Sequence, residues 1–224
     1  MTKRPGLRER KFARTRLKLA QALVQRLAHS SLDEIVVRDL CEDVEVSEAT
    51  FFNYFPRKLD LLDYYTQLWT LELGWRCQNS EAHGLATITV AFDFMAASFQ
   101  KQSGVMGEII ARQALLRDKP QPVEIGLAER QIAFPDYAGI EALPVGGVDK
   151  VWLPVLEQAI RSGELPSNTH VPTVMVGLAS IFYGLPLVLR QGNLTAITSM
   201  YHQQLVVFWA GVRSASKGVS WEIS

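Results

Sequence analysis

The chain has 224 residues, of which 48% are hydrophobic and 21% charged, the balance of an ordinary folded protein. Its formal net charge is zero, yet the first eighteen residues hold eight basic residues and one acidic residue, which favours either an anionic partner or a solubilising tail. Cys41 and Cys77 show no spacing typical of a metal site or a disulfide framework, and the N-terminus lacks the apolar core of a secretory signal. These features favour a cytoplasmic protein without a metal or other cofactor.

Apolar residues recur at helical spacing along most of the chain, and no run of strict alternation indicates a β-strand. The spacing predicts an all-α fold of about nine helices, over about Lys11–His29, Val37–Val44, Ser47–Phe55, Leu59–Trp75, Leu85–Gln102, Val105–Asp118, Val148–Arg161, Thr173–Arg190 and Leu194–Arg213. Residues 119–147 are the least regular segment, with four prolines, four glycines and at most a short helix near Val123–Arg130. The sequence does not reveal what this segment does.

The most informative stretch runs from Val37 to Leu62. A short amphipathic helix ends at about Val44, and Ser47 then occupies the N-cap position of a second short helix, which Pro56 terminates. Two short helices joined by a tight turn form the unit that places its second helix in the major groove of DNA. With basic residues just upstream, the pattern indicates a DNA-binding regulator.

This stretch and the first helix resemble the TetR family of transcriptional regulators. The matching residues are Arg16, Leu19, Ala22, Leu27, Val37, Arg38, Asp39, Leu40, Val46, Ser47, Thr50, Phe51, Phe52, Tyr54, Phe55, Lys58 and Leu62. The resemblance covers about fifty residues, and the string TFFNYFPRK is similar to the recognition-helix motif of the family. It implies an N-terminal three-helix DNA-binding head, residues 1–58, and a larger helical ligand-binding and dimerisation domain, residues 59–224.

The chain departs from the family pattern at three positions. Glu45 stands where the family usually has a turn glycine, so the turn needs either a strained left-handed backbone at this residue or a slightly different geometry. Val36 replaces the usual capping threonine and has no side-chain oxygen with which to cap. Phe52 replaces the commonest tyrosine and lacks the hydroxyl that would reach a phosphate.

The candidate DNA contacts combine short polar side chains, which suit base edges, with basic ones, which suit phosphates. They are Lys3, Arg4, Arg8, Arg38, Ser47, Thr50, Asn53, Tyr54 and Lys58. By resemblance, Lys58 binds a phosphate and Tyr54 lies at the DNA surface. Lys3, Arg4 and Arg8 are expected to follow phosphates or enter a minor groove, as basic arms do.

The C-terminal part carries no catalytic signature, because its histidines have no spacing for a metal or a nucleophile, so the protein is not expected to be an enzyme. Aromatic and apolar residues predict an interior that, by resemblance, lines a ligand cavity; simple core packing is the alternative. The candidate ligand residues are Phe92, Met95, Phe99, Ile110, Gln113, Trp152, Phe182 and Tyr183.

The last two predicted helices bear more apolar surface than one helix face needs, which suggests a two-fold homodimer interface. Its candidate residues are Leu178, Ile181, Leu185, Ile197, Tyr201, Leu205 and Phe208. Residues 171–189 contain no charge and reach the length of a membrane span. We favour a helix buried by the protein and a partner subunit, because polar and helix-breaking residues dilute the run and no aromatic belt flanks both ends.

The sequence therefore predicts a homodimer that binds a double-stranded operator and represses transcription until a small, largely apolar molecule releases it. One alternative keeps the DNA-binding heads but places them under a protein partner or no effector. Another is a membrane-anchored protein that uses residues 171–189 as its span. The sequence does not identify the effector, the operator or the regulated genes.

Overall fold

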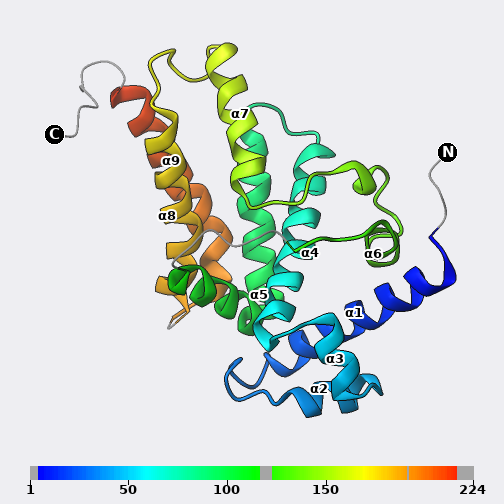
Figure 1. The fold of residues 1–224 in the computed structure, drawn as a ribbon. Coiled ribbons are helices and arrows are strands. Elements are labelled where there is room, and N and C mark those ends of the chain that lie inside the picture. Colours follow the sequence, from blue (N-terminus) through cyan, green and yellow to red (C-terminus); the bar gives the residue numbers. More distant parts are fainter. Residues whose placement is uncertain (1–4, 117–122, 191, 216–224) are drawn as a thin grey trace. The chain divides into compact units, whose positions relative to one another are not determined.

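The computed structural model describes residues 5–116, 123–190 and 192–215. Within these residues the chain forms nine α-helices, two short 3₁₀ helices and no β-strand (Figure 1), as the all-α prediction requires. The elements are α1 (Leu7–Arg26), α2 (Val37–Val44), α3 (Glu48–Tyr54), α4 (Lys58–Gln78), α5 (Ala86–Leu115), α6 (Leu127–Ala133), η1 (Ile140–Ala142), α7 (Asp149–Arg161), α8 (Val171–Leu189), η2 (Leu194–Ala196) and α9 (Ile197–Ala215).

The chain divides into two compact units, each built from two separate stretches of sequence. Unit 1 comprises Met1–Trp75 and Gln102–Gly146, and unit 2 comprises Arg76–Lys101 and Gly147–Ser224. Residues 1–58 thus share unit 1 with part of α4, the end of α5 and the irregular segment. The division of function at residue 58 remains a prediction.

In unit 1, helices α1 to α3 enclose a small apolar core at the N-terminal end of the chain (Figure 1). The core side chains are all less than 6% exposed and include Leu19, Leu23, Leu40, Cys41, Phe51 and Phe55. Arg26, in the last turn of α1, binds two carboxylates of α2. Its Nε donates to Asp43 at 2.6 Å, and its NH1 lies 3.4 Å from Asp39. This hydrogen bond lowers the pKa of the Asp43 carboxyl.

The end of α1 also approaches α5 closely at Gly104. A Cβ atom built on Gly104 would lie 1.8 Å from the carbonyl oxygen of Leu27, far inside van der Waals contact. Only glycine fits at this position without moving the backbone. Just before it, Gln102 has non-helical angles, φ −144° and ψ 53°, and interrupts α5. The sequence pattern predicted two helices here, ending and resuming on either side of this break.

The irregular segment is organised around the buried guanidinium of Arg130 on α6. Its Nε donates to the carbonyl of Ile125 at 3.1 Å, and its NH1 donates to the carbonyls of Ile140 and Leu143 at 3.0 and 2.6 Å. One side chain therefore donates hydrogen bonds to backbone carbonyls in the segments before and after α6, which have no regular secondary structure to pair them.

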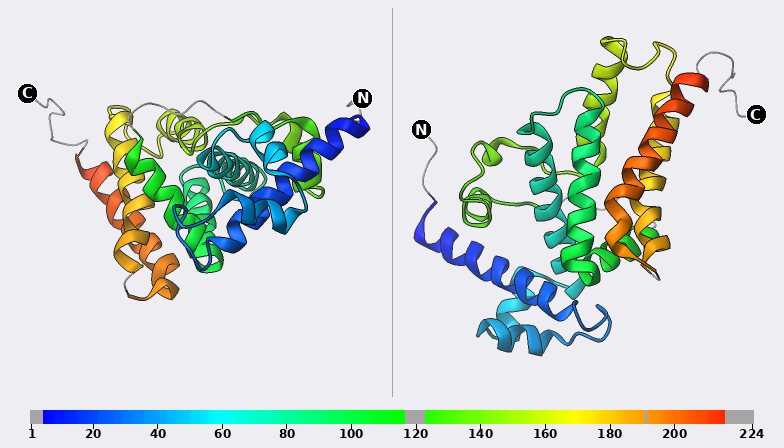
Figure 2. Two further views of the ribbon diagram at one scale, coloured as in Figure 1. Left: turned by 60° about the horizontal axis from the view of Figure 1, so that its bottom comes forward. Right: turned by 180° about the vertical axis from the view of Figure 1, so that it is seen from behind.

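In unit 2, the first part of α5 contributes to one aromatic core with α7, α8 and α9. Helices α8 and α9 run side by side, as Figures 1 and 2 both show. Gly177 on α8 lies against the ring of Phe208 on α9, where a Cβ atom would approach within 2.4 Å of the ring. Past the end of α7, Gly163 has φ +80°, the left-handed conformation that glycine commonly adopts just after a helix.

Helix α8 is long and apolar enough to cross a membrane by length and composition alone. That is weak evidence for a span, because core helices of soluble proteins pass the same test. Within the chain only Val174, Leu178, Phe182 and Pro186 of this helix are buried. This chain alone therefore does not bury α8 on nearly all sides.

Candidate nucleic-acid interface

The turn between α2 and α3 is built without glycine. Glu45 adopts φ 59° and ψ 46°, the left-handed conformation that was one of the two alternatives left open by the sequence, and it is the only non-glycine residue with positive φ among those described. The turn is closed by backbone hydrogen bonds from Glu45 to Glu42 and from Val46 to Cys41, at 3.2 and 3.0 Å. A left-handed non-glycine residue costs roughly 1–2 kcal/mol, so the surrounding packing must hold it in place.

Ser47 is the N-cap of α3, as predicted. Its backbone is extended, and its Oγ accepts a hydrogen bond from the backbone N–H of Thr50 at 3.2 Å. The two hydroxyls also lie 2.9 Å apart and form a hydrogen bond. Val36 caps α2 with no side-chain hydrogen bond, as expected from its chemistry. Ser47 and Thr50 therefore fix the orientation of α3 in the free protein.

The short helix α3 has one buried and one exposed face. Phe51 is fully buried, with Phe55, just past the helix, 1% exposed, and these two rings support the helix from behind. On the other face, Phe52 is 48% exposed and Asn53 is exposed. Tyr54 is half-buried and packs edge-on against Phe12 of α1, with ring centroids 4.8 Å apart. The helix thus presents Asn53 and Phe52 outward on a rigid base.

The basic candidates occupy different surroundings. Lys58, at the start of α4, donates from Nζ to the carbonyls of Ile35 and Asp33 at 2.6 and 3.2 Å, so it fastens the segment before α2. Arg38 is exposed, with its Nε 3.6 Å from Glu42. Arg8 is exposed in the first turn of α1, whereas Lys3 and Arg4 lie outside the described residues.

A buried ion pair that the sequence did not reveal lies beneath this head. Arg16 of α1 and Glu129 of α6 are 8% and 3% exposed, and their side chains approach within 2.9 Å. Glu129 also accepts a hydrogen bond from the Tyr64 hydroxyl at 2.7 Å. The Arg16 guanidinium lies over the ring of Tyr64, 4.1 Å from its centroid. Burial, with the neighbouring Glu129 carboxylate as a second cause, raises the pKa of Tyr64.

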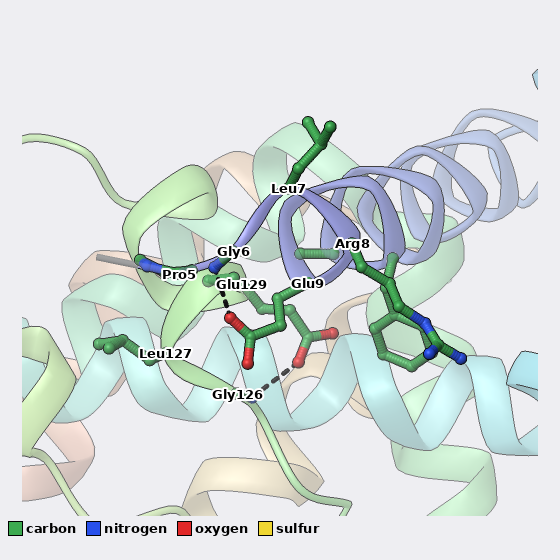
Figure 3. A pocket seen from close by; sticks show the side chains of 11 residues that line it. Pro5, Gly6, Leu7, Arg8, Glu9, Gly126, Leu127 and Glu129 are labelled. Carbon is green, nitrogen blue, oxygen red and sulfur yellow. Dashed lines mark hydrogen bonds between the residues drawn. The ribbon is translucent and has the colours of Figure 1, made fainter. Parts of the chain in front are cut away.

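The N-termini of α1 and α6 are capped in the same way, by a glutamate that lies three residues after a glycine. Glu9 accepts a hydrogen bond from the backbone of Gly6 at 2.6 Å, and Glu129 accepts one from the backbone of Gly126 at 2.7 Å (Figure 3). In each case a glycine precedes a glutamate by three residues, which is a helix-start signal that could have placed both helices. It explains why α1 begins four residues before the expected Lys11 and why α6 covers residues 127–133 rather than 123–130.

The ligand candidates divide between the two units. Phe92, Met95, Phe99, Trp152 and Phe182 are all buried in unit 2, and Tyr183 beside them is half-buried. Ile110 and Gln113 belong instead to unit 1, where Ile110 is buried and Gln113 is exposed. The structure therefore does not place these last two in the aromatic cluster of unit 2.

Four rings form the centre of that cluster. Phe92 packs edge-on against Phe182 and Tyr201 at centroid distances of 5.0 and 4.9 Å, and Trp152 packs edge-on against Phe182 at 5.1 Å. The Tyr201 hydroxyl donates to the carbonyl of Phe182 at 2.6 Å. The indole Nε1 of Trp152 is buried without a hydrogen-bond partner. A buried donor of this kind is costly and offers a hydrogen bond to any acceptor that reaches it.

The dimer candidates also separate into two groups. Leu178, Ile197, Tyr201 and Leu205 are buried inside their own chain, so in this structure they offer no side-chain surface to a second copy. These four residues face the aromatic core of their own chain. Helical spacing alone does not show whether an apolar helix face packs inside the chain or lies on its surface. Ile181, Leu185 and Phe208 are partly exposed. The most exposed apolar side chains of α8 and α9 are Val176, Leu187, Val188, Val206 and Val207.

No protein-family model matches the sequence, and no curated protein matches it. Solved structures do match the fold. A TetR-family transcriptional regulator from Streptomyces coelicolor is 16% identical, with a TM-score of 0.57 over 96% of this chain and 85% of its own. The ketosteroid transcriptional regulator KstR2 of Mycobacterium tuberculosis is 17% identical, with a TM-score of 0.52 over 88% of this chain and 94% of its own.

A TetR family transcriptional regulator from Chloroflexus aurantiacus is 20% identical, with a TM-score of 0.50 over 89% of this chain and 94% of its own. In all three cases the match spans most of both chains. The chain therefore has the fold of TetR-family transcriptional regulators, as the resemblance in residues 16–62 implied.

Proposed function

We propose that this chain is a cytoplasmic, non-catalytic transcriptional regulator that binds an operator as a homodimer and represses transcription. The observation that carries the proposal is the α2–α3 unit. Its second helix is fixed by the Ser47 cap and by two buried rings, and it turns exposed Asn53 and Phe52 outward. Helices presented in this way enter the major groove in helix-turn-helix proteins. The fold shared with solved transcriptional regulators supports this reading.

The candidate side chains then take two roles on DNA. Asn53, with Thr50 and Ser47 at the start of α3, is suited to base edges, because short amides and hydroxyls read adenine and other bases there. Arg8, Arg38, Tyr54 and Lys58 are suited to phosphates, which fix register without reading sequence. Lys58 has two of its three protons on backbone carbonyls, so one remains for a phosphate. Lys3 and Arg4, which lie outside the described residues, are proposed to bind phosphates as well.

A second copy of the chain is the occupant that we propose for the outer face of α8 and α9. Val176, Val188, Val206 and Val207 are each at least 67% exposed, and Ile181, Leu185 and Phe208 add partly exposed apolar surface. Exposed apolar residues gathered on two adjacent helices mark interaction surfaces. A two-fold dimer would also supply the second head that a palindromic operator requires.

The aromatic cluster of unit 2 is the proposed place for a small, largely apolar effector. Its rings offer an apolar lining, and the free donor of Trp152 supports a ligand that carries one acceptor atom, such as a carbonyl oxygen. Binding there must favour the arrangement that cannot hold DNA. A tenfold higher affinity for that arrangement shifts the equilibrium between the two arrangements by only about 1.4 kcal/mol. An effective inducer therefore needs a larger difference in affinity.

Selection of binding sites from random duplexes tests the DNA-binding proposal. We expect enrichment of a palindromic sequence, and fluorescence anisotropy on that sequence should show Asn53→Ala losing about 1–3 kcal/mol of discrimination. Gln100→Ala, an exposed amide on α5, is the matched control and should bind like wild type. No enrichment above random sequence by the wild-type protein would contradict the proposal.

Light scattering in detergent-free buffer tests the dimer. We expect the mass of two chains at micromolar concentration, and Val207→Glu should give a folded monomer because the side chain is 68% exposed in one chain. A wild-type monomer would contradict the interface. Recovery of the chain only in the membrane fraction would instead support α8 as a span.

A thermal-shift series with apolar compounds, ketosteroids among them, followed by DNA-release assays, tests the effector. Release by apolar compounds, with loss of the effect in Phe92→Leu, supports the unit 2 site. If no compound releases DNA from a protein that binds its operator, control by a protein partner or the absence of an effector becomes the better reading.

A further inference from the structure

A cavity, separate from the aromatic cluster, lies within unit 1 between the N-terminal turns of α1 and α6 (Figure 3). Its volume of about 740 Å³ is within the range of small-molecule sites. The lining comes from Pro5 to Glu9, Phe12 and Ala13 on one side and from residues 126–129 on the other.

Most of the lining is apolar. Leu7 is 61% exposed and Phe12 is 40% exposed, and both line the cavity together with Leu127 and Ala128. A ring and two leucines on an open surface are able to cover the hydrocarbon part of a ligand. The same Phe12 ring packs against Tyr54 of α3 at 4.8 Å, so an occupant of the cavity touches a side chain that supports the recognition helix.

The charged side chains that point into the cavity are both acidic. The carboxylates of Glu9 and Glu129 come from the two facing helices and both point into the cavity, whereas Arg8 extends away from them (Figure 3). Glu129 is already neutralised by Arg16 at 2.9 Å. Glu9 accepts only a backbone hydrogen bond from Gly6, and no Lys, Arg or His of the described chain forms an ion pair with it. A carboxylate that no basic side chain of the described chain pairs with therefore stands at an apolar wall.

We propose that this cavity is a second ligand site and that it takes an amphipathic organic amine. The ammonium group would pair with Glu9, and the Phe12 ring would contact the hydrocarbon body and the cation face-on. An anionic ligand would meet two carboxylates and is disfavoured. Because the site lies beside Phe12, its occupant would act directly on the head, and that part of the inference rests on the proposed DNA-binding function.

Calorimetric titration at neutral pH with three compounds that share a phenyl ring on a four-carbon chain tests the site: 4-phenylbutylamine, 4-phenylbutanol and 4-phenylbutyrate. We expect the amine to bind wild-type protein about tenfold more tightly than the alcohol, and the acid to bind weakest. Glu9→Gln keeps the shape of the side chain and should remove this preference. The backbone amide resonances of Gly6 and Gly126 should shift on addition of the amine, which places the ligand between the two helices.

Glu34→Gln is the matched control, because Glu34 is also exposed and also accepts a backbone hydrogen bond, from Ser31 at 2.8 Å, but lies outside the cavity. It should keep the full preference for the amine. Phe12→Leu gives a second variant and should weaken the amine more than the alcohol. Equal binding of the three compounds, no binding of any, or a preference that survives in Glu9→Gln would overturn the proposal. The titration contains no DNA, so its failure is distinguishable from a failure of DNA binding.

Discussion

The two units of this protein bury different chemistry. The four buried polar or charged residues of the described chain, Arg16, Thr70, Glu129 and Arg130, all belong to unit 1. Unit 2 is filled by packed rings, among them the buried Phe92, Trp152, Phe182 and Tyr201. A buried ion pair requires defined directions and distances, whereas an aromatic core requires mainly volume. We expect unit 1 to hold one geometry and unit 2 to tolerate repacking.

This contrast suits the proposed division of labour. A head that reads DNA needs fixed spacing between its side chains, and the pair of Arg16 and Glu129 joins α1 to α6 beneath that head. A region that accepts an apolar effector needs an interior whose contacts can be exchanged. The predictions below test whether the two interiors respond differently, from the largest expected effect to the smallest.

Glu129→Gln should have the largest effect. It leaves the Arg16 guanidinium buried without its counter-charge, and breaking a buried pair in this way costs about 3–5 kcal/mol. Urea unfolding followed by amide exchange should show the loss mainly in unit 1. The double variant Arg16→Met, Glu129→Leu should recover a large part of it, because an apolar pair of similar volume avoids the unpaired charge. Equal losses in the single and double variants would mean that the unpaired Arg16 charge is not the cause, and that the hydrogen bonds of Glu129 with Tyr64 and Gly126 matter more.

Trp152→Phe should have a smaller effect, confined to unit 2. The indole Nε1 has no partner, so the substitution removes ring volume but no hydrogen bond, and we expect a loss of about 1–3 kcal/mol. Amide exchange in α7 and α8 should report it while α1 and α2 stay protected. Protection factors that fall in both units alike would contradict the separation of the two cores.

Local patterns were enough to predict the two short helices α2 and α3. The end of α2 near Val44 and the cap at Ser47 both depend on residues within one or two helical turns, and the structure shows each of them. The break in α5 was foreseen for the same reason. Short-range rules determine such features because the interacting groups are close in sequence.

Long-range features were not accessible from spacing. Arg16 and Glu129 are separated by more than a hundred residues, and nothing in either local pattern shows that one must neutralise the other. Likewise Tyr201 and Ile197 lie on an apolar helix whose inner and outer faces are both apolar, so the pattern did not show that they face the core. Resolving such cases requires knowing which helices are neighbours.

Alkaline pH should weaken both units through their buried tyrosines, and unit 2 further through the Cys77 thiol, whose pKa burial raises to about 12. Burial raises the pKa of Tyr65 in unit 1 and of Tyr183 in unit 2 to about 12 in each case. Above pH 10 the unfolded state releases these protons and the folded state keeps them, so stability falls as pH rises. Each tyrosine should account for about 1.4 kcal/mol lost by pH 11. Urea midpoints measured at pH 8 and pH 11 check this, and Tyr65→Phe should recover its share in unit 1 alone.

Phe52→Tyr should have the smallest effect and the opposite sign. Phe52 is 48% exposed on α3 beside Asn53, so an added hydroxyl stays in water and costs the fold nothing. In a complex with DNA it could donate to a phosphate, a contact worth about 0.5–1.5 kcal/mol, or roughly two- to tenfold in affinity. Because phosphates carry no sequence, fluorescence anisotropy should show the same gain on the selected operator and on random duplex. Phe134→Tyr, which adds a hydroxyl at the end of α6, should leave both affinities unchanged. If Phe52→Tyr gains nothing on either duplex, the outer face of α3 does not approach the DNA backbone at this position, and the docking of the head must be revised.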